Sequence, residues 1–355
     1  MPIVRLSGRV LGAEDPKRKD RAELLYHIFA NGWDIYNSNG DQSVRLENIQ
    51  KKIIETDAFV FTPSPSLEDY FNLSSIFVGF QTNDSDLTGK SAIIVNSDES
   101  WNSFLEMCNH LKLLGTVKQN YSEFVEVVKA SSDVVEKLKA TKISGSYKPS
   151  DEPDFVNAGA IYKENESHIK KPKFKVCVFC SASIKKKDYL EEGYNLGGLI
   201  AKKNWGCISG AGKTGIMGEV VRGAYENGGW SAGSNVPHII QMEGLPDGLN
   251  EFWPRGDIYT RMEVMIRKSN AFVIMPGGMG TVQELFALLL LKHQNNDLMR
   301  DKKIVIYNKL DSEFAKRFWN PILEIIKKFE NFNCNFQVAN EFEEIIPLLE
   351  QKCEI

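Results

Sequence analysis

The stretch RMEVMIRKSNAFVIMPGGMGTVQELFALLLLKH, residues 261–293, decides the fold of this chain. It runs from a segment with helical spacing (261–270) through the apolar run AFVIM (271–275) and a glycine-rich turn into a second helical segment (281–293). A short apolar run without a polar face is typical of a strand buried on both sides, as in a parallel sheet covered by helices. The stretch therefore predicts a helix–strand–helix unit of an α/β sheet.

The same alternation continues on both sides of that stretch. Upstream, the patterns predict strands over 175–183 and 207–212 and helices over 188–204 and 215–228, and downstream they predict a strand over 303–308. Strands that alternate with helices form parallel sheets covered on both faces. We therefore predict a Rossmann-like, doubly wound parallel α/β fold.

The first half of the chain repeats this pattern in weakened form. TDAFVFTP (56–63) aligns without gaps on SNAFVIMP (269–276), and LEDYF (67–71) aligns on VQELF (282–286) after a two-residue deletion. The strand-like runs in 29–40 and 90–100 likewise parallel those that flank the second-half motif. Such internal similarity indicates a duplicated α/β unit, although two unrelated α/β domains could share such a composition.

The duplication divides the chain into two expected domains. Residues 1–140 form a degenerate Rossmann-like copy, and residues 175–355 form the complete domain. Between them, residues 141–174 are polar and contain three prolines, which is typical of a linker.

Composition indicates a small-molecule partner. The 355-residue chain has a formal net charge of −4, so it carries no overall basic field of the kind that holds nucleic acid. Its start, MPIVRLSGRVLGAED, lacks the charged and then apolar pattern of a secretion signal. The longest apolar run, 285–291, is far shorter than the roughly 20 residues that a membrane span needs. We therefore expect a cytoplasmic protein that binds neither nucleic acid nor a membrane.

Cys177 and Cys180 form a C-x-x-C motif, which occurs in redox pairs and as half of zinc sites. The run around them, KVCVFCSAS, is apolar, and no second C-x-x-C or Cys/His pair completes a metal site. A buried strand is therefore the favoured interpretation, and no metal is expected.

The strongest local signal is the glycine-rich turn between the 271–275 strand and the helix after it. Glycines let the backbone turn tightly and point its N–H groups at one ligand, and a helix start adds free N–H groups and a positive end. A plain strand-to-helix turn is the alternative, but three glycines in four residues favour an anion site. The predicted phosphate-binding residues are Gly277, Gly278, Gly280 and Thr281.

A second glycine loop follows the 207–212 strand. Its Gly212-Lys213-Thr214 resembles part of a Walker A motif, but Cys207 stands where that motif needs its first glycine, so an ATPase is excluded. We expect this loop to form another wall of a nucleotide pocket, although a plain turn is equally compatible with it. The predicted pocket residues are Ser183, Gly210, Gly212, Lys213, Gly215, Met217 and Gly218.

Glu284 lies three residues after Thr281, and the spacing alone leaves two roles open. Thr-x-x-Glu is a capping box, in which the glutamate closes the start of a helix. Alternatively, the carboxylate faces a ribose whose phosphate sits on the glycine loop, where it would stabilise the positive sugar formed as a C1′–N bond breaks. Arg261 could pair with that carboxylate, but spacing does not distinguish it from Arg267 and Lys268.

Three segments together resemble the Lonely Guy family, whose members are cytokinin riboside 5′-monophosphate phosphoribohydrolases and whose bacterial relatives cleave AMP or other nucleotides. The segments are VCVFCSAS (176–183), SGAGKTGIMG (209–218) and TRMEVMIRKSNAFVIMPGGMGTVQELF (260–286). The family pattern P-G-G-x-G-T-x-x-E is complete from Pro276 to Glu284, and the resemblance covers about residues 174–330. It implies that Arg261 and Glu284 are catalytic and that the protein is a homodimer or a higher homo-oligomer.

Some positions depart from the family pattern. Met262 and Asn270 stand where the family often has Lys and Asp, and Lys213 and Thr214 replace small residues, which leaves the preferred base open. In the first half, Asn48 replaces the arginine, Asp69 replaces the glutamate, and Ser64-Pro65-Ser66 replaces most of the glycine loop. We predict that this half does not hydrolyse nucleotide, although it could pack like a partner subunit.

The expected reaction is hydrolysis of the N-glycosidic bond of a nucleoside 5′-monophosphate, AMP or an N6-modified AMP, to the free base and ribose 5-phosphate. No metal or redox cofactor is expected. The donor that protonates the leaving base is not identified, since His238 is a candidate but a structural role is favoured for it. The alternative is a non-catalytic nucleotide or cofactor carrier or sensor, which would keep the glycine loop without needing the pair of Arg261 and Glu284.

Overall fold

The structure is a computed structural model, and it describes residues 2–6, 18–36, 46, 53, 55–82, 87, 90–141, 169–329 and 336–351. In the first half the elements are β1 (Ile3–Leu6), α1 (Arg18–Ala30), β2 (Asp34–Tyr36), β3 (Ala58–Phe61), α3 (Leu67–Gln81), β4 (Ser91–Val95), α4 (Asn102–Leu111), the 3-10 turn η1 (Tyr121–Glu123), β5 (Val125–Val128) and α5 (Ser131–Lys139).

The second half carries the longer set of elements. These are β6 (Lys175–Phe179), α7 (Lys187–Lys202), β7 (Gly206–Ser209), α8 (Gly215–Glu226), β8 (Ser231–Gly233), α9 (Pro237–Glu243), β9 (Glu251–Phe252), α10 (Ile258–Lys268), β10 (Ala271–Ile274), α11 (Met279–His293), β11 (Lys303–Tyr307), the π-helical turn η2 (Ala315–Trp319), α12 (Asn320–Lys327), β12 (Phe336–Ala339), the 3-10 turn η3 (Phe342–Glu344) and α13 (Ile345–Glu350).

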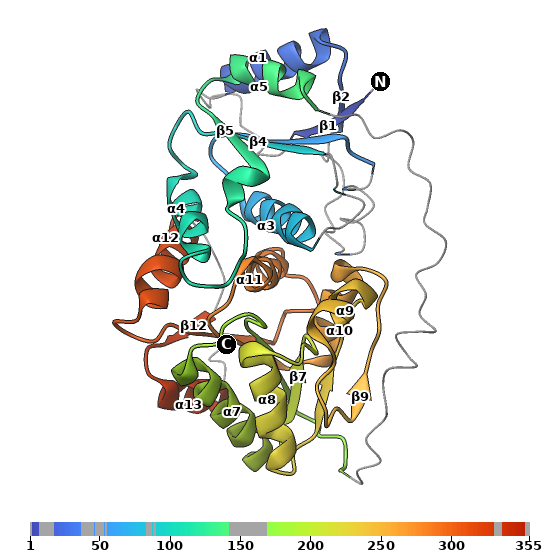
Figure 1. Ribbon diagram of the computed structural model, residues 1–355. Coiled ribbons are helices and arrows are strands. Elements are labelled where there is room, and N and C mark those ends of the chain that lie inside the picture. Colours follow the sequence, from blue (N-terminus) through green and yellow to red (C-terminus); the bar gives the residue numbers. More distant parts are fainter. Residues whose placement is uncertain are drawn as a thin grey trace.

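Each half holds its own parallel sheet, with helices on both faces (Figure 1). The strand orders are β2-β1-β3-β4-β5 and β12-β11-β10-β6-β7-β8-β9, and every pairing is parallel. The α/β doubly wound fold predicted from the sequence is therefore confirmed. No helix among the described residues is both long and apolar enough to span a membrane.

The two sheets share one topology. β2, β1, β3, β4 and β5 occupy, in order, the places of β7, β6, β10, β11 and β12. The gapless alignment also holds in space, because β3 begins at Ala58 and β10 at the aligned Ala271. Ala58 pairs with the first residues of the register in β1 and β4, and Ala271 pairs in the same way with β6 and β11. The duplication expected from the sequence is therefore visible in the fold.

The halves differ in the connection between the second and third of these five strands, counted along the chain. The second half inserts α8, β8, α9, β9 and α10 between β7 and β10, whereas the first half has only residues 37–57 between β2 and β3. The sequence patterns predicted α8 and α10 but missed β8, α9 and β9, which are too short to show a clear period. This insertion supplies one complete wall of the site described below.

The core is continuous across the two halves. One cluster of buried apolar side chains includes Phe59 and Phe61 of β3, Tyr70 of α3, and Phe286 of α11. A separate cluster lies on the outer face of the first sheet, under α1 and α5, and contains Val4 and Val60. Figure 1 shows α3 and α11 side by side between the two sheets. The halves are therefore joined by buried apolar surface rather than by the intervening segment alone.

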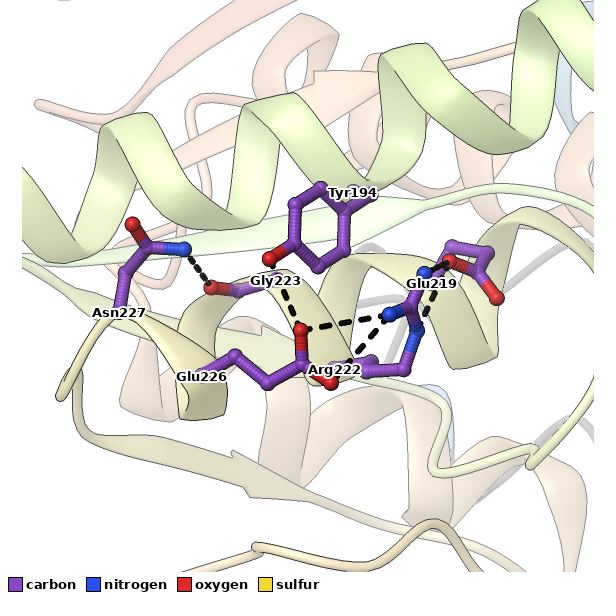
Figure 2. A network of polar contacts seen from close by, with 6 residues as sticks. All are labelled: Tyr194, Glu219, Arg222, Gly223, Glu226 and Asn227. Carbon is purple, nitrogen blue, oxygen red and sulfur yellow. Dashed lines mark hydrogen bonds and ion pairs between the residues drawn. The ribbon is translucent and has the colours of Figure 1, made fainter.

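Helices α7 and α8 pack at very short distance, which fixes the start of α8 near the site. A Cβ on Gly197 would lie 2.0 Å from the carbonyl oxygen of Val220, and one on Gly223 would lie 1.9 Å from that of Tyr194. At the rim, the Tyr194 hydroxyl donates to Glu226 (2.8 Å), and the Arg222 guanidinium lies 4.4 Å from the Tyr194 ring centre (Figure 2). The glycines set the helix spacing, and the polar network lies at its exposed edge.

We expect Gly197→Ala to destabilise the protein by about 2 kcal/mol or more, because the added methyl group meets backbone atoms of α8 that cannot move independently. Gly198→Ala is the matched control in the same helix, since its methyl group would meet only the Asn227 side chain. Helix propensity favours that control by up to about 1 kcal/mol. Urea unfolding measures both, and equal stabilities for the two variants would contradict the packing argument.

Candidate nucleotide site

Three loops meet at the carboxyl edge of the second sheet. The loop after β6 is bound to the loop after β10, because the Ser181 amide donates to the Pro276 carbonyl at 3.2 Å. It is also bound to the start of α8, since the Thr214 hydroxyl donates to the Ala182 carbonyl at 2.8 Å. β6 lies between β7 and β10. The chain runs from β6 to β7 on one side of it and later returns to add β10 on the other side, so the strand order reverses at β6. Open α/β sheets bind ligands at such a switch point.

The glycine loop after β10 has the geometry of an anion cradle. α11 begins at Met279, with Gly278 as its N-cap, and no side chain caps it. Within the described part of the chain, the amides of Gly277 and Gly278 donate no hydrogen bond. Gly277 is required, because a Cβ there would lie 1.9 Å from the Thr281 hydroxyl oxygen. The loop therefore presents unpaired N–H groups at the positive end of a helix.

The structure excludes one of the two roles that spacing left open for Glu284, the capping box. α11 starts two residues before Thr281, so Thr281 lies inside the first turn and forms no capping box with Glu284. The capping box is found instead in the first half, where Ser66 caps α3 and its amide donates to Asp69 at 2.7 Å. Asp69, the aligned counterpart of Glu284, therefore has a structural role.

The first-half counterpart of the glycine loop is closed by its own hydrogen bonds. The Ser64 amide donates to the Ser100 hydroxyl at 3.0 Å, and the Ser66 amide is taken by Asp69. Pro65 has no amide N–H. The N–H groups that remain for an anion are therefore fewer than in the second half. Asn48, the aligned counterpart of Arg261, lies outside the described residues.

Arg261 is fixed by two backbone carbonyls and faces Glu284. Its Nε donates to the Ser234 carbonyl at 2.9 Å and its Nη2 to the Gly210 carbonyl at 3.1 Å. The remaining Nη1 lies 3.8 Å from Glu284 Oε1, with only 12% and 6% of the two side chains exposed. Gly210 must be glycine, because a Cβ there would lie 2.0 Å from Arg261 Nη2. The second glycine loop and the β8–α9 turn thus aim the guanidinium at Glu284.

A second carboxyl group, Glu243, is near enough to the same arginine for its charge to lower the pKa of Glu243. It is the last residue of α9, and its Oε2 lies against Gly212, where a Cβ would be 2.4 Å away. Sequence analysis missed it, because Glu243 belongs to no motif and α9 itself was not predicted. The only local signal is Gly244 directly after it, which ends the helix with a φ of +71°.

Burial dominates the protonation of both carboxyl groups. It raises the pKa of Glu284 to about 7, against the opposing attraction of Arg261 and with a further increase from Glu243. Burial also raises the pKa of Glu243, again opposed by Arg261. Glu284 is buried and Glu243 is partly buried, so both carboxyl groups hold a proton more readily than exposed glutamates do.

The remaining predicted pocket residues surround this centre unequally. Met217 is buried, and its sulfur accepts from the Gly212 amide at 3.1 Å. Gly215, with φ of +62°, and Gly218 pack against backbone atoms of the neighbouring loop and of Lys213. Ser183 is exposed on the loop after β6. Lys213 is also exposed, and its Nζ lies 3.3 Å from Asp247.

The C-x-x-C motif lies in the core. Cys177 is in β6, Cys180 directly follows that strand, and both thiols are fully buried, which raises their pKa values well above the usual range. Thiols held protonated are poor nucleophiles and poor metal ligands. The buried-strand interpretation of this motif is confirmed.

Comparison with known proteins places the second half near one protein family. Residues 217–351 match the family model described as possible lysine decarboxylase, which is the Lonely Guy family. This match lies within the second half of the chain. The resemblance noted in the sequence is therefore confirmed for that half.

Relatives in this family carry consistent names. Over 111 residues the chain is 32% identical to the cytokinin riboside 5′-monophosphate phosphoribohydrolase of Mycobacterium tuberculosis, covering 31% of this chain and 59% of that protein. Over 166 residues it is 28% identical to an enzyme of the same name from Arabidopsis thaliana, covering 46% and 73%. Among solved structures, the molybdenum cofactor binding protein of Rippkaea orientalis matches at 19% identity and a TM-score of 0.38, covering 51% and 96%.

Burial of Glu284 leads to a prediction about stability. Its pKa is about 7 in the folded protein and near 4.5 when exposed, so its contribution to the free energy of unfolding is full below pH 4.5 and is lost as pH rises through 7. Since one pKa unit corresponds to about 1.4 kcal/mol, the loss is at most about 3 kcal/mol. Glu284→Gln should therefore gain stability relative to wild type between pH 5 and pH 8.

Urea unfolding at the two pH values measures this difference. The exposed Glu343→Gln serves as the control and should follow wild type at both. If Glu284→Gln and wild type differ by the same amount at pH 5 and pH 8, the carboxyl group is not desolvated as described.

Proposed function

We propose that the second half hydrolyses the N-glycosidic bond of a nucleoside 5′-monophosphate, of the AMP or N6-modified AMP type, to a free base and ribose 5-phosphate. The observation that carries this proposal is that Glu284, paired with Arg261 at 3.8 Å, lies on the helix that begins at the glycine loop, where no hydrogen bond from the Gly277 and Gly278 amides is found among the described residues. The family domain supports it, because relatives of that domain are named as phosphoribohydrolases. A protein that only carried a nucleotide would need the amides but not the buried charged pair.

The geometry suggests one orientation for the substrate. The 5′-phosphate lies on the loop of Gly277, Gly278 and Gly280, with the Thr281 hydroxyl beside it. Glu284 is in the second turn of the same helix, about one helical turn further along from Thr281, which suits a ribose placed between phosphate and carboxylate. The base then extends toward the 210–218 loop, where Met217 provides apolar surface.

The proposed reaction proceeds by charge separation at C1′. The C1′–N bond breaks and its electron pair goes to the base, so the sugar ring becomes positive and the base needs a proton. The ionised Glu284 stabilises the sugar cation and orients a water, whose oxygen bonds to C1′ and whose released proton is taken up by that carboxylate. The reaction consumes only water, and Arg261 keeps Glu284 in place and favours its ionised form.

We assign proton donation to Glu243. Burial raises the pKa of both carboxyl groups, against the opposing attraction of Arg261, which favours a protonated form at neutral pH more than in exposed glutamates. Glu243 lies against Gly212, on the loop where the base is expected, whereas Glu284 lies on the helix that follows the phosphate loop. Paired carboxyl groups with different surroundings are a common solution to acid and base roles in glycoside cleavage.

Removing either member of the charged pair should abolish turnover. We expect Glu284→Gln and Arg261→Ala to lower kcat on AMP by at least about 100-fold, because each removes transition-state charge stabilisation. Arg267→Ala, in the same helix but exposed, should retain wild-type kinetics. Release of adenine and ribose 5-phosphate by chromatography is the measurement, and a panel of purine, pyrimidine and N6-modified monophosphates then ranks the bases.

Two outcomes would contradict this assignment. Near-wild-type turnover in Glu284→Gln or Arg261→Ala would remove that residue from the mechanism. Wild-type protein that binds AMP by calorimetry but releases no base from any member of the panel would be a nucleotide carrier rather than a hydrolase.

The role of Glu243 can be separated from that of Glu284 by changing the leaving group. Glu243→Gln should lower kcat on AMP by about 100-fold or more, the usual contribution of a general acid. The loss should be much smaller on 4-nitrophenyl riboside 5-phosphate, whose phenolate leaves without a proton, while Glu284→Gln should impair both substrates. If Glu243→Gln lowers kcat by the same factor on both substrates, Glu243 is not the proton donor.

A further inference from the structure

Helices of corresponding position in the two halves pack against each other. α3 contacts α11, its aligned counterpart, and α4 contacts α12, which follows the strand equivalent to the one before α4 (Figure 1). At the centre, the ring of Tyr70 stacks on that of Phe286 with centroids 5.2 Å apart and an interplanar angle of 17°. Like-with-like contact is the arrangement of a two-fold symmetric dimer. Here both partners belong to one chain.

Three contacts of this interface reach the residues that flank the site. The Gln283 side-chain amide, next in sequence to Glu284, donates to the Ser75 hydroxyl at 3.0 Å, and both groups are buried. The Phe71 ring packs edge-on against Tyr259, two residues before Arg261, with centroids 6.3 Å apart.

The third contact lies at the anion cradle. A Cβ on Gly278 would lie 3.1 Å from the Thr116 carbonyl oxygen and 3.2 Å from its Cβ. Thr116 follows α4 of the first half, and its hydroxyl donates to the Leu111 carbonyl at 3.0 Å, which fixes its position. The first half therefore contacts the glycine loop directly, at Gly278.

We propose that the first half acts as a built-in partner subunit that positions the hydrolytic site: Ser75 and Phe71 hold α11 and α10 so that Glu284 and Arg261 meet, and Thr116 closes the cradle at Gly278. The inference rests on the proposed function of the second half. Ser75 and Gln283 are positioning residues, since they act on Glu284 through the first turns of α11.

The physical basis is the sensitivity of such a site to small displacements. Arg261 and Glu284 come from different helices, and their 3.8 Å separation leaves little tolerance for a shift of either helix. Misplacement by about 1 Å can cost about 100-fold in rate. In this arrangement α3 covers the face of α11 that points away from the second sheet. A second copy of the chain therefore cannot dock on that face. Any homo-oligomer must use another surface.

Ser74 and Ser75 provide a matched pair of variants. Both are fully buried in α3, and both hydroxyls donate to the Phe71 carbonyl, but only that of Ser75 accepts from Gln283. Ser75→Ala leaves the Gln283 amide without its acceptor, so we expect kcat on AMP to fall by about 10-fold with KM changed less than about two-fold. Ser74→Ala should have wild-type kinetics. Both are assayed well below their melting temperatures.

Hydrogen–deuterium exchange gives a readout that does not depend on activity. We expect faster exchange over residues 277–286 in Ser75→Ala and wild-type exchange there in Ser74→Ala. If wild type hydrolyses no nucleotide while this difference is seen, the proposed function fails and the positioning stands. If exchange and kcat are the same in both variants, the positioning role is wrong.

Gln283→Leu keeps the test decisive if Ser75→Ala does not fold. Leucine has a similar volume and needs no hydrogen-bond partner, and Ser75 still donates to Phe71. This variant should also show faster exchange over 277–286 and a kcat reduced by about 10-fold. Wild-type values for both measurements in Gln283→Leu would overturn the proposal.

Discussion

The site depends on one constraint: a guanidinium held by backbone carbonyls rather than by carboxylates. Arg261 donates hydrogen bonds from its Nε and Nη2 to the carbonyls of Ser234 and Gly210. These neutral groups compensate its positive charge only in part. Its remaining nitrogen faces Glu284, and the burial of that glutamate keeps the carboxyl pKa near neutrality. A group in that range can exist in either protonation state at physiological pH, which is the condition for acid or base chemistry.

The same constraint explains why the insertion between β7 and β10 distinguishes the two halves. The carbonyls that bind Arg261 come from the loops after β7 and β8, and α9 and α10 carry Glu243 and Arg261 themselves. The first half shares the five-strand order but has only residues 37–57 at that point. It retains the fold of the domain while the segment that supplies the arginine and the second carboxyl group is largely missing.

Sequence alone predicted most of the fold but only part of the site. Long apolar runs gave β6, β10, β11 and the helices beside them to within a few residues, because burial on both faces leaves a strong pattern. It missed β8, α9 and β9, whose short segments carry no period, and with them Glu243. The capping-box alternative for Glu284 could not be resolved from spacing, because it depends on whether α11 begins at Met279 or after Thr281. Contacts such as Ser75 with Gln283 join residues 208 positions apart, and no local pattern records them.

The capping box at Ser66 and Asp69 is a substitution that only one of the two halves carries. In a symmetric pair of identical subunits, every substitution at the shared interface occurs twice, so a residue cannot be lost from one active centre and kept in the other. Fusion into a single polypeptide removes that restriction. The first half has serines and a proline where the second half has glycines, and its helix α3 starts with a capping box. The second half keeps the glycine loop. In the proposed arrangement, one copy keeps the open glycine loop and the other contributes the helices that pack against it.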